Sequence, residues 1–224
     1  REFIDKAGVS RNKGITDVST LEFAIREDLN NNATRAMCVL HPLKVTLTNF
    51  PEDKTEILKT AGHPSREDLG TRELPFSNTL LIDQDDFREE ANKQYKRLVI
   101  GKRVRLRNAY VIEADEAVKD SDGNIIEVKA RFIEGTLGHN PEDGIKPKGV
   151  IHWVDAGTAQ QAEFRLYDRL FNDENPLGHE DRDFMDFINP EFAQPICNKR
   201  RRFRQIKPQF RIAMHPMSPF PHFM

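Results

Sequence analysis

The fold of this chain is decided by residues 102–132, which read KRVRLRNAYVIEADEAVKDSDGNIIEVKARF. Apolar and charged residues alternate from Lys102 through Ile112, and successive side chains of a strand point to opposite faces, so this part predicts a half-buried strand. The DSDGN run at 120–124 predicts a tight turn in which glycine supplies a positive φ. Residues 126–132 alternate again as the partner strand. The stretch therefore predicts a β-hairpin with three guanidinium groups on one face, from Arg103, Arg105 and Arg107.

Further short strands are expected on both sides of this hairpin. Alternating or continuous apolar residues bounded by turn signals are typical of strands. They occur at residues 43–47, 80–83, 150–154 and 163–171. Several short strands separated by turns favour an all-β barrel or sandwich over a βαβ architecture.

The start of the chain has a different period. Ser19 followed three residues later by Glu22 has the form of a capping box. Apolar residues then recur at helical spacing until the asparagine run at 30–32. The sequence therefore predicts a helical segment followed by two β units.

The formal net charge of -2 hides an uneven distribution. Residues 91–112 contain seven basic residues and no acidic one, whereas residues 83–90 are mostly acidic. A local basic stripe in an otherwise acidic chain indicates a polyanionic partner at one place, and the alternative is a solvated face. From Phe192 onward the chain is again basic and rich in proline, a composition typical of a disordered segment or a basic arm.

Several functional classes find no support in the sequence. No stretch approaches the roughly 18 consecutive apolar residues of a membrane span, and no signal peptide is recognisable, so we expect a cytoplasmic protein. A phosphate-binding glycine loop, a G-x-S-x-G elbow and an H-E-x-x-H motif are absent from the sequence, and its histidines lack metal-ligand spacing. We therefore expect no catalytic residue and no metal ligand in this chain.

The basic segment has the composition of a surface that reads RNA. Residues 87–98 combine cations, an amide and an aromatic ring, which can neutralise phosphates, bond to base edges and stack on an unpaired base. Charge neutralisation alone would not require an amide at Gln94 or a planar fork held on a strand at Arg105. This combination favours single-stranded RNA as the partner.

The same segment resembles the signature of the glutaminyl-tRNA synthetases. The resemblance lies in DFREEANKQYKRL at 86–98, continued by GK at 101–102 and VRLRNAY at 104–110. Further runs follow in the order of the family: IREDLN at 25–30, RAM at 35–37, KGVIHWV at 148–154 and RLYDRLF at 165–171. The resemblance covers most of residues 1–191.

The resemblance implies the C-terminal half of a class I aminoacyl-tRNA synthetase. That half is mainly β, with two β-barrels of the ribosomal L25-like anticodon-binding fold, the distal one inserted in the proximal one, after a short helical segment. The implied division is 1–32 for the helical end of the catalytic half, 33–90 for the first part of the proximal barrel, 91–175 for the distal barrel, 176–191 for the return to the proximal barrel and 192–224 for a divergent basic tail. We expect that tail to be disordered, which puts closure of the proximal barrel in doubt.

The implied partner is the anticodon loop of a glutamine-accepting tRNA. Carried over by position, the RNA-binding residues are Arg35, Gln94, Lys96, Arg97 and Arg105, with Arg107, Asn30 and Tyr95 as neighbours. The reaction that the family performs is the ATP-dependent attachment of glutamine to its tRNA. ATP with magnesium is expected in a nucleotide-binding half outside this chain, and we expect a monomer.

Two other readings remain open. The chain could be the corresponding part of a glutamyl-tRNA synthetase, although the KQYKR run at 93–97 favours glutamine. It could also be a non-catalytic L25-like protein that binds ribosomal RNA, and the helical segment at 1–32 argues against that reading.

Overall fold

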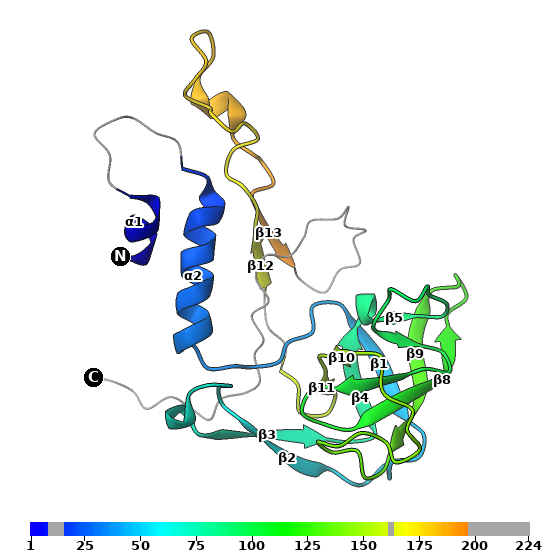
Figure 1. Ribbon diagram of the computed structural model, residues 1–224. Coiled ribbons are helices and arrows are strands. Elements are labelled where there is room, and N and C mark those ends of the chain that lie inside the picture. The colour runs from blue at the N-terminus through cyan, green and yellow to red at the C-terminus, as the bar shows by residue number, and fades with distance from the viewer. Residues whose placement is uncertain (9–15, 161–163, 197–224) are drawn as a thin grey trace. The chain divides into compact units, whose positions relative to one another are not determined.

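The computed structural model describes residues 1–8, 16–160 and 164–196, and they fall into two compact units (Figure 1). The first unit takes its described residues from 1–34 and 164–196, and the second takes them from 35–160. Most of the regular structure is strand, and it follows two helices. The prediction of a mainly β chain preceded by a helical segment is therefore confirmed.

The first unit contains the helices. α1 (Glu2–Ala7) lies against α2 (Val18–Asn32), and α2 begins two residues earlier than a cap at Ser19 would place it. The Asp17 carboxylate accepts a hydrogen bond from the Ser19 amide at 2.8 Å, so Asp17 is the N-cap and the expected capping box is wrong. No helix in the described part of the chain is long and apolar enough to cross a membrane.

The same unit contains one pair of strands. β12 (Phe164–Tyr167) pairs antiparallel with β13 (Ala193–Ile196), and a short 3-10 helix, η3 (Phe184–Phe187), lies between them in the sequence. β13 falls inside the range that we expected to be a disordered tail. That expectation is wrong for residues 193–196, because their backbone pairs with β12. The rest of the expected tail, 197–224, lies outside the described residues.

The second unit is built on a seven-stranded sheet in the order β10-β7-β8-β9-β1-β4-β11. The strands are β1 (Pro42–Leu47), β4 (Thr79–Asp83), β7 (Arg103–Leu106), β8 (Val111–Lys119), β9 (Ile125–Ile133), β10 (Val150–Ile151) and β11 (Val154–Asp155). Neighbours are antiparallel except for two parallel pairs, β1 with β9 and β10 with β7.

The connection between β10 and β11 requires this sheet to curl. The two strands lie at opposite ends of the strand order, yet Ile151 and Val154 are only three residues apart. Three residues span at most about 11 Å, whereas seven flat strands at their usual spacing would extend about 29 Å. The two edges must therefore approach each other. Trp153 lies on this connection and is fully buried inside the curl.

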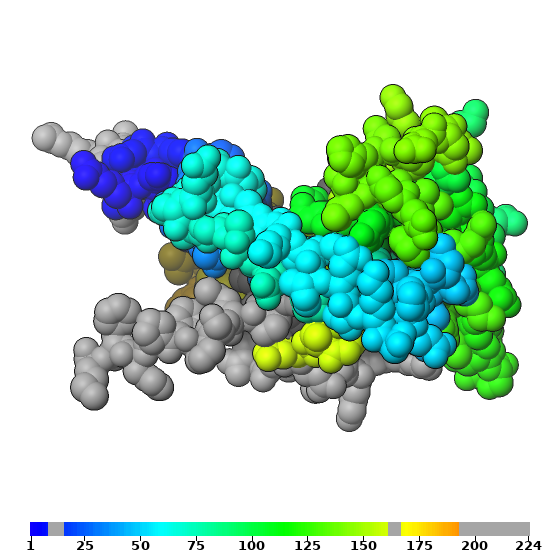
Figure 2. All heavy atoms as spheres, turned by 90° about the horizontal axis from the view of Figure 1, so that it is seen from below, coloured from blue at the N-terminus to red at the C-terminus, as the bar shows by residue number. Residues whose placement is uncertain are grey.

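Two smaller strand pairs complete the unit. β2 (Glu56–Ala61) and β3 (Thr71–Phe76) form an antiparallel hairpin whose outer end contains η1 (Glu67–Leu69). Figures 1 and 2 show this end, in cyan, extending away from the sheet. β5 (Phe87–Arg88) pairs in parallel with β6 (Leu98–Val99), just after η2 (Gln84–Asp86).

The core of the unit is aromatic at its centre. Phe76 contacts Phe50, Tyr110 and Trp153 with ring centroids 5.2–5.4 Å apart, and Phe132 closes the group against Phe50 and Tyr110. Tilted and edge-on rings at these distances are favourable beyond the area that they bury. The rings come from residues 50–153, so the packing depends on strands far apart in the sequence.

Two further differences from the predicted organisation lie in the second unit. The expected strand through Tyr110 is interrupted by a turn: Asn108 adopts a left-handed φ of 58°, and the Leu106 amide donates to the Tyr110 carbonyl at 3.0 Å. The two arms, β7 and β8, pair with each other. The sheet also takes strands from both 33–90 and 91–175, so no break occurs at residue 91. The division into proximal and distal barrels stays a prediction.

Candidate nucleic-acid interface

The basic segment forms a loop that is closed at its base. Phe87 and Leu98 are partners in the parallel pair β5–β6 and are buried, so the chain between them must leave the sheet and return. At the tip, the Asn92 carboxamide oxygen accepts hydrogen bonds from the amides of Gln94 at 3.1 Å and Tyr95 at 3.2 Å. This local turn leaves the side chains of Gln94 and Lys96 exposed.

Tyr95 is held inward by its hydroxyl group. The hydroxyl donates to the Asp85 carbonyl at 2.8 Å, and the Arg88 guanidinium lies 4.5 Å from the centroid of the ring. Burial raises the pKa of Tyr95 from 10.0 to about 12, which moves ionisation of the phenol further above neutral pH. Arg88 therefore covers part of the surface on which we expected a base to stack.

Arg97 is engaged at the base of the loop. Its Nε lies 2.8 Å from a carboxylate oxygen of Asp86, which is only 7% exposed, and its Nη1 donates to the Lys96 carbonyl at 3.2 Å. A buried carboxylate needs a partner of this kind, because leaving it uncompensated is costly. In the structure Arg97 therefore fixes the loop, and a contact with RNA is open only to its remaining donors.

The alternation predicted for residues 103–106 is confirmed. Val104 and Leu106 are buried, whereas Arg103 and Arg105 are half-buried on the opposite face of β7. This face is occupied by the chain's own segment 134–149. Arg105 donates to the Thr136 carbonyl at 2.7 Å and to the Asn140 side chain at 3.3 Å, and it also bonds to the His139 carbonyl. A contact between Arg105 and RNA would therefore replace contacts that the folded chain already makes.

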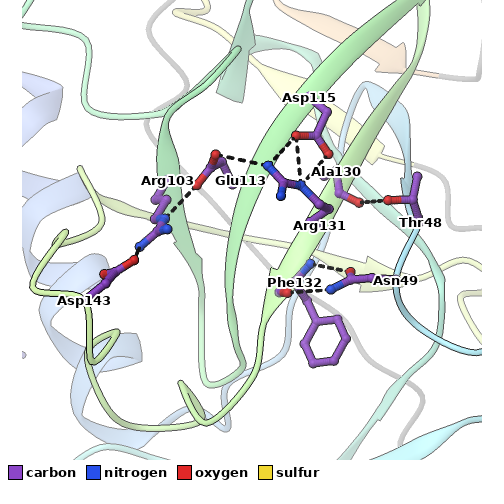
Figure 3. Close-up of polar contacts among 9 residues, drawn as sticks. All are labelled: Thr48, Asn49, Arg103, Glu113, Asp115, Ala130, Arg131, Phe132 and Asp143. Carbon is purple, nitrogen blue, oxygen red and sulfur yellow. Dashed lines mark hydrogen bonds and ion pairs between the residues drawn. The ribbon is translucent and has the colours of Figure 1, made fainter.

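Arg103 holds the other end of segment 134–149. Its Nη1 lies 2.5 Å from Asp143, and its Nε lies 2.7 Å from Glu113 on β8 (Figure 3). Glu113 also contacts Arg131 at 3.3 Å, and Arg131 reaches Asp115. The hydrogen bonds that Arg103 donates to Glu113 first, and then to Asp143, hold the pKa of Arg103 above its ordinary value. The carboxylates of this network compensate the charge of Arg103, which alternation placed on the same face as Arg105 and Arg107.

Arg107 differs from Arg103 and Arg105. It follows the end of β7, its side chain is exposed, and within the described residues that side chain forms no hydrogen bond or ion pair. Its backbone is firmly held, because the Arg107 amide donates to the Ile151 carbonyl at 2.9 Å and the Trp153 indole donates to the Arg107 carbonyl at 2.9 Å. The structure thus presents an open cation on a rigid support.

Segment 134–149 brings one further cation to the loop of Gln94 and Lys96. The Lys148 amide donates to the Arg103 carbonyl at 2.8 Å, and the Gly149 carbonyl accepts from the Arg105 amide at 2.9 Å. A Cβ added to Gly149 would lie 2.1 Å from the Lys96 carbonyl oxygen, so the two segments touch at their backbones. Lys148 is exposed, and it directly precedes Gly149, which touches Lys96. The KPKG run at 146–149 is basic, but its charge in the sequence did not indicate that it lies next to the loop of Gln94 and Lys96.

The last two predicted residues lie elsewhere. Arg35 is half-buried in the second unit, and its amide donates to the Gly62 carbonyl at 3.0 Å beside the hairpin β2–β3. Asn30 is exposed on α2 in the first unit. The structure therefore brings Gln94, Lys96 and Tyr95 together on one loop, and it places neither Arg35 nor Asn30 on that loop.

Comparison with known proteins gives two matches to family models and many relatives. Both models are described as the anticodon-binding domain of class I tRNA synthetases (E and Q), and they match residues 33–133 and 150–199. The chain is 52% identical over 201 residues to a glutamine–tRNA ligase of Pseudomonas syringae, with 89% of the chain and 35% of the relative covered. It is 50% identical over 212 residues to one of Colwellia psychrerythraea, with 94% and 38% covered, and 55% identical over 192 residues to one of Stutzerimonas stutzeri, with 85% and 34% covered. The chain thus spans about a third of the length of these relatives.

Proposed function

This chain belongs to the family of class I (E and Q) tRNA synthetase anticodon-binding domains, and from that premise we propose that it binds the anticodon loop of a glutamine-accepting tRNA. The observation that carries the proposal is the contact between the loop of Gln94 and Lys96 and the segment of Lys148. This contact places the exposed amide of Gln94 and the exposed cations of Lys96 and Lys148 on two adjoining segments. The backbone of each segment is held by hydrogen bonds. An anticodon loop offers phosphates and unpaired bases, which are the groups that such side chains bind.

The proposed residues divide into two roles. Exposed side chains are available for RNA: Gln94 for a base edge, and Lys96, Lys148 and Arg107 for phosphates or bases. Arg97 and Arg105 hold the loops in place with contacts to their own chain, and any RNA contact by them must share or exchange those bonds. Arg35, Asn30 and Tyr95 remain proposed contributors, carried over from the family resemblance.

The proposal extends to the reaction that the matched relatives are named for. The relatives are named glutamine–tRNA ligases, and we propose that this chain serves the same reaction, the attachment of glutamine to its tRNA. ATP with magnesium would be held by a nucleotide-binding half, and no residue of this chain is assigned to it. A cytoplasmic, monomeric protein is part of the same proposal. The glutamine relatives favour this reading over a glutamyl-tRNA synthetase.

The direct test measures binding of the 224-residue chain to a glutamine tRNA and to the same tRNA with substituted anticodon bases. We expect each substituted base that is read by a paired contact to cost about 1–3 kcal/mol of binding free energy. Equal affinity for all the tRNAs would refute anticodon reading, because phosphate contacts do not distinguish sequences.

A pair of lysine variants tests the location of the surface. Lys96→Ala should reduce the slope of log affinity against log salt by about 1, as expected for one lost phosphate contact. Lys129→Ala is the matched control, since the side chain of Lys129 on β9 is 44% exposed and pairs with Glu116 at 3.0 Å. An equal change of slope in both variants would place the RNA elsewhere or show that its binding is non-specific.

A further inference from the structure

The backbone at Arg35 is fixed by the hairpin β2–β3. The Arg35 amide donates to the Gly62 carbonyl at 3.0 Å, directly after the last residue of β2. Gly62 in turn donates its own amide to the Gly70 carbonyl at 2.8 Å, which extends the hairpin pairing beyond the strands. A Cβ at Gly62 would lie 2.4 Å from the Leu69 carbonyl oxygen, so the close approach requires glycine there.

Arg72 holds the other backbone polar group of Arg35, its carbonyl. Its Nη1 donates to the Arg35 carbonyl at 2.5 Å, from a position on β3 opposite Thr60. Both the amide and the carbonyl of Arg35 are therefore bound by residues of one hairpin. Such a double tether fixes the direction in which the Arg35 side chain leaves the backbone.

The surroundings of Arg72 do not favour its charge. Burial lowers the pKa of its guanidinium, and Nε is buried with no hydrogen-bond partner. Within the described residues no carboxylate forms an ion pair with it, whereas Arg66 on the outer end of the same hairpin pairs with Asp68. Burying a cation against a carbonyl alone is a poor source of stability. The hydrogen bond to the Arg35 carbonyl is the one polar contact that the guanidinium of Arg72 makes among the described residues.

We propose that Arg72 is a positioning residue for anticodon recognition, which acts by holding the backbone of Arg35. The inference rests on the proposed function, in which Arg35 contacts the anticodon loop. A side chain that starts from a fixed backbone loses less conformational freedom on binding, and its planar donors keep a constant orientation toward the RNA. Arg72 itself does not touch the RNA in this proposal.

A double-mutant cycle tests the dependence on Arg35. The variants are Arg72→Met, Arg35→Ala and the double variant of the 224-residue chain, each titrated with the glutamine tRNA. We expect Arg72→Met to weaken binding about fivefold in the wild-type background and less than about twofold when Arg35 is already alanine, because interacting residues are not additive. Arg66→Met, on the same hairpin, should leave the affinity unchanged. If the loss of affinity in the double variant equals the product of the two single losses, the two residues act independently and the proposal is overturned.

Two further measurements separate this proposal from its alternatives. Hydrogen exchange at the Arg35 amide, followed without RNA, should become at least about tenfold faster in Arg72→Met, because local opening becomes easier. Unchanged exchange would overturn the positioning role whether or not the chain reads anticodons. A salt slope that falls by about 1 in Arg72→Met would show a direct phosphate contact and would also refute it. Arg72→Lys, which keeps the charge, replaces the methionine variant if that one fails to fold.

Discussion

Replacing Arg105 by methionine removes the bonds that hold segment 134–149 to β7 while keeping an unbranched apolar side chain in place of the arginine stem. Arg105 donates to the carbonyls of Thr136 and His139 and to the Asn140 side chain. Thr136 is itself buried, and its hydroxyl accepts from the Val111 amide at 2.9 Å and donates to the Ile133 carbonyl at 2.6 Å. The segment should therefore loosen at His139 and Asn140 first and remain attached at Thr136.

The expected loss of stability follows from these contacts. The bond to the Thr136 carbonyl is partly buried and involves a charged donor, a type that contributes about 1.5–3 kcal/mol. The bonds to His139 and Asn140 lie in exposed surroundings, where each adds about 0.5 kcal/mol or less. We expect Arg105→Met to lower the free energy of unfolding by about 2 kcal/mol.

Urea unfolding followed by tryptophan fluorescence measures this loss. The chain has one tryptophan, Trp153, buried in the same unit. A loss of about 2 kcal/mol corresponds to a midpoint lower by about 1 M urea for a unit of this size. Arg107→Met is the matched control and should change stability by less than about 0.5 kcal/mol, because the Arg107 side chain is exposed and forms no hydrogen bond or ion pair within the described residues. Equal stability of the Arg105 and Arg107 variants would refute the view that Arg105 holds the segment.

Two other outcomes are expected. Gly149→Ala should destabilise the unit by about 1–3 kcal/mol and weaken tRNA binding, since its Cβ would meet the Lys96 carbonyl oxygen; Gly157→Ala, whose Cβ has only an ordinary contact at 3.5 Å, should do neither. Burial raises the pKa values of Tyr95 and Tyr110 to about 12 from an ordinary 10.0, so the folded state keeps phenols that the unfolded chain ionises. Stability should be unaffected by them below about pH 10 and fall from there to about pH 12. Tyr110→Phe should show a smaller fall in urea unfolding, and an identical fall would contradict the assigned burial.

The local features of the chain could be predicted from its sequence. Alternation along residues 103–106 assigns the buried face of β7, and the turn at 120–124 forms as expected, with Gly123 at a φ of 81°. Helical periodicity places α2 within two residues of its observed start. These features depend on backbone preferences and on the period of apolar residues, which neighbours in the sequence determine.

The turn at Asn108 was missed for a local reason. Asparagine is tolerated at a positive φ, but its neighbours carry no glycine or proline to indicate a turn. The alternating pattern continued across it and predicted one strand where there are two.

The sequence by itself determined the family resemblance, the basic stripe and which side chains share a face of β7. Only the tertiary structure decided what covers that face. Arg105 contacts a carbonyl 31 residues away and Arg103 contacts a carboxylate 40 residues away. Such pairs form because β10 pairs with β7, which brings residues 134–149 back from β9 to β7. Alternation along one strand carries no information about the segment that returns. The arginines that looked alike in sequence are therefore different in structure: two hold the protein's own chain, and Arg107 remains exposed.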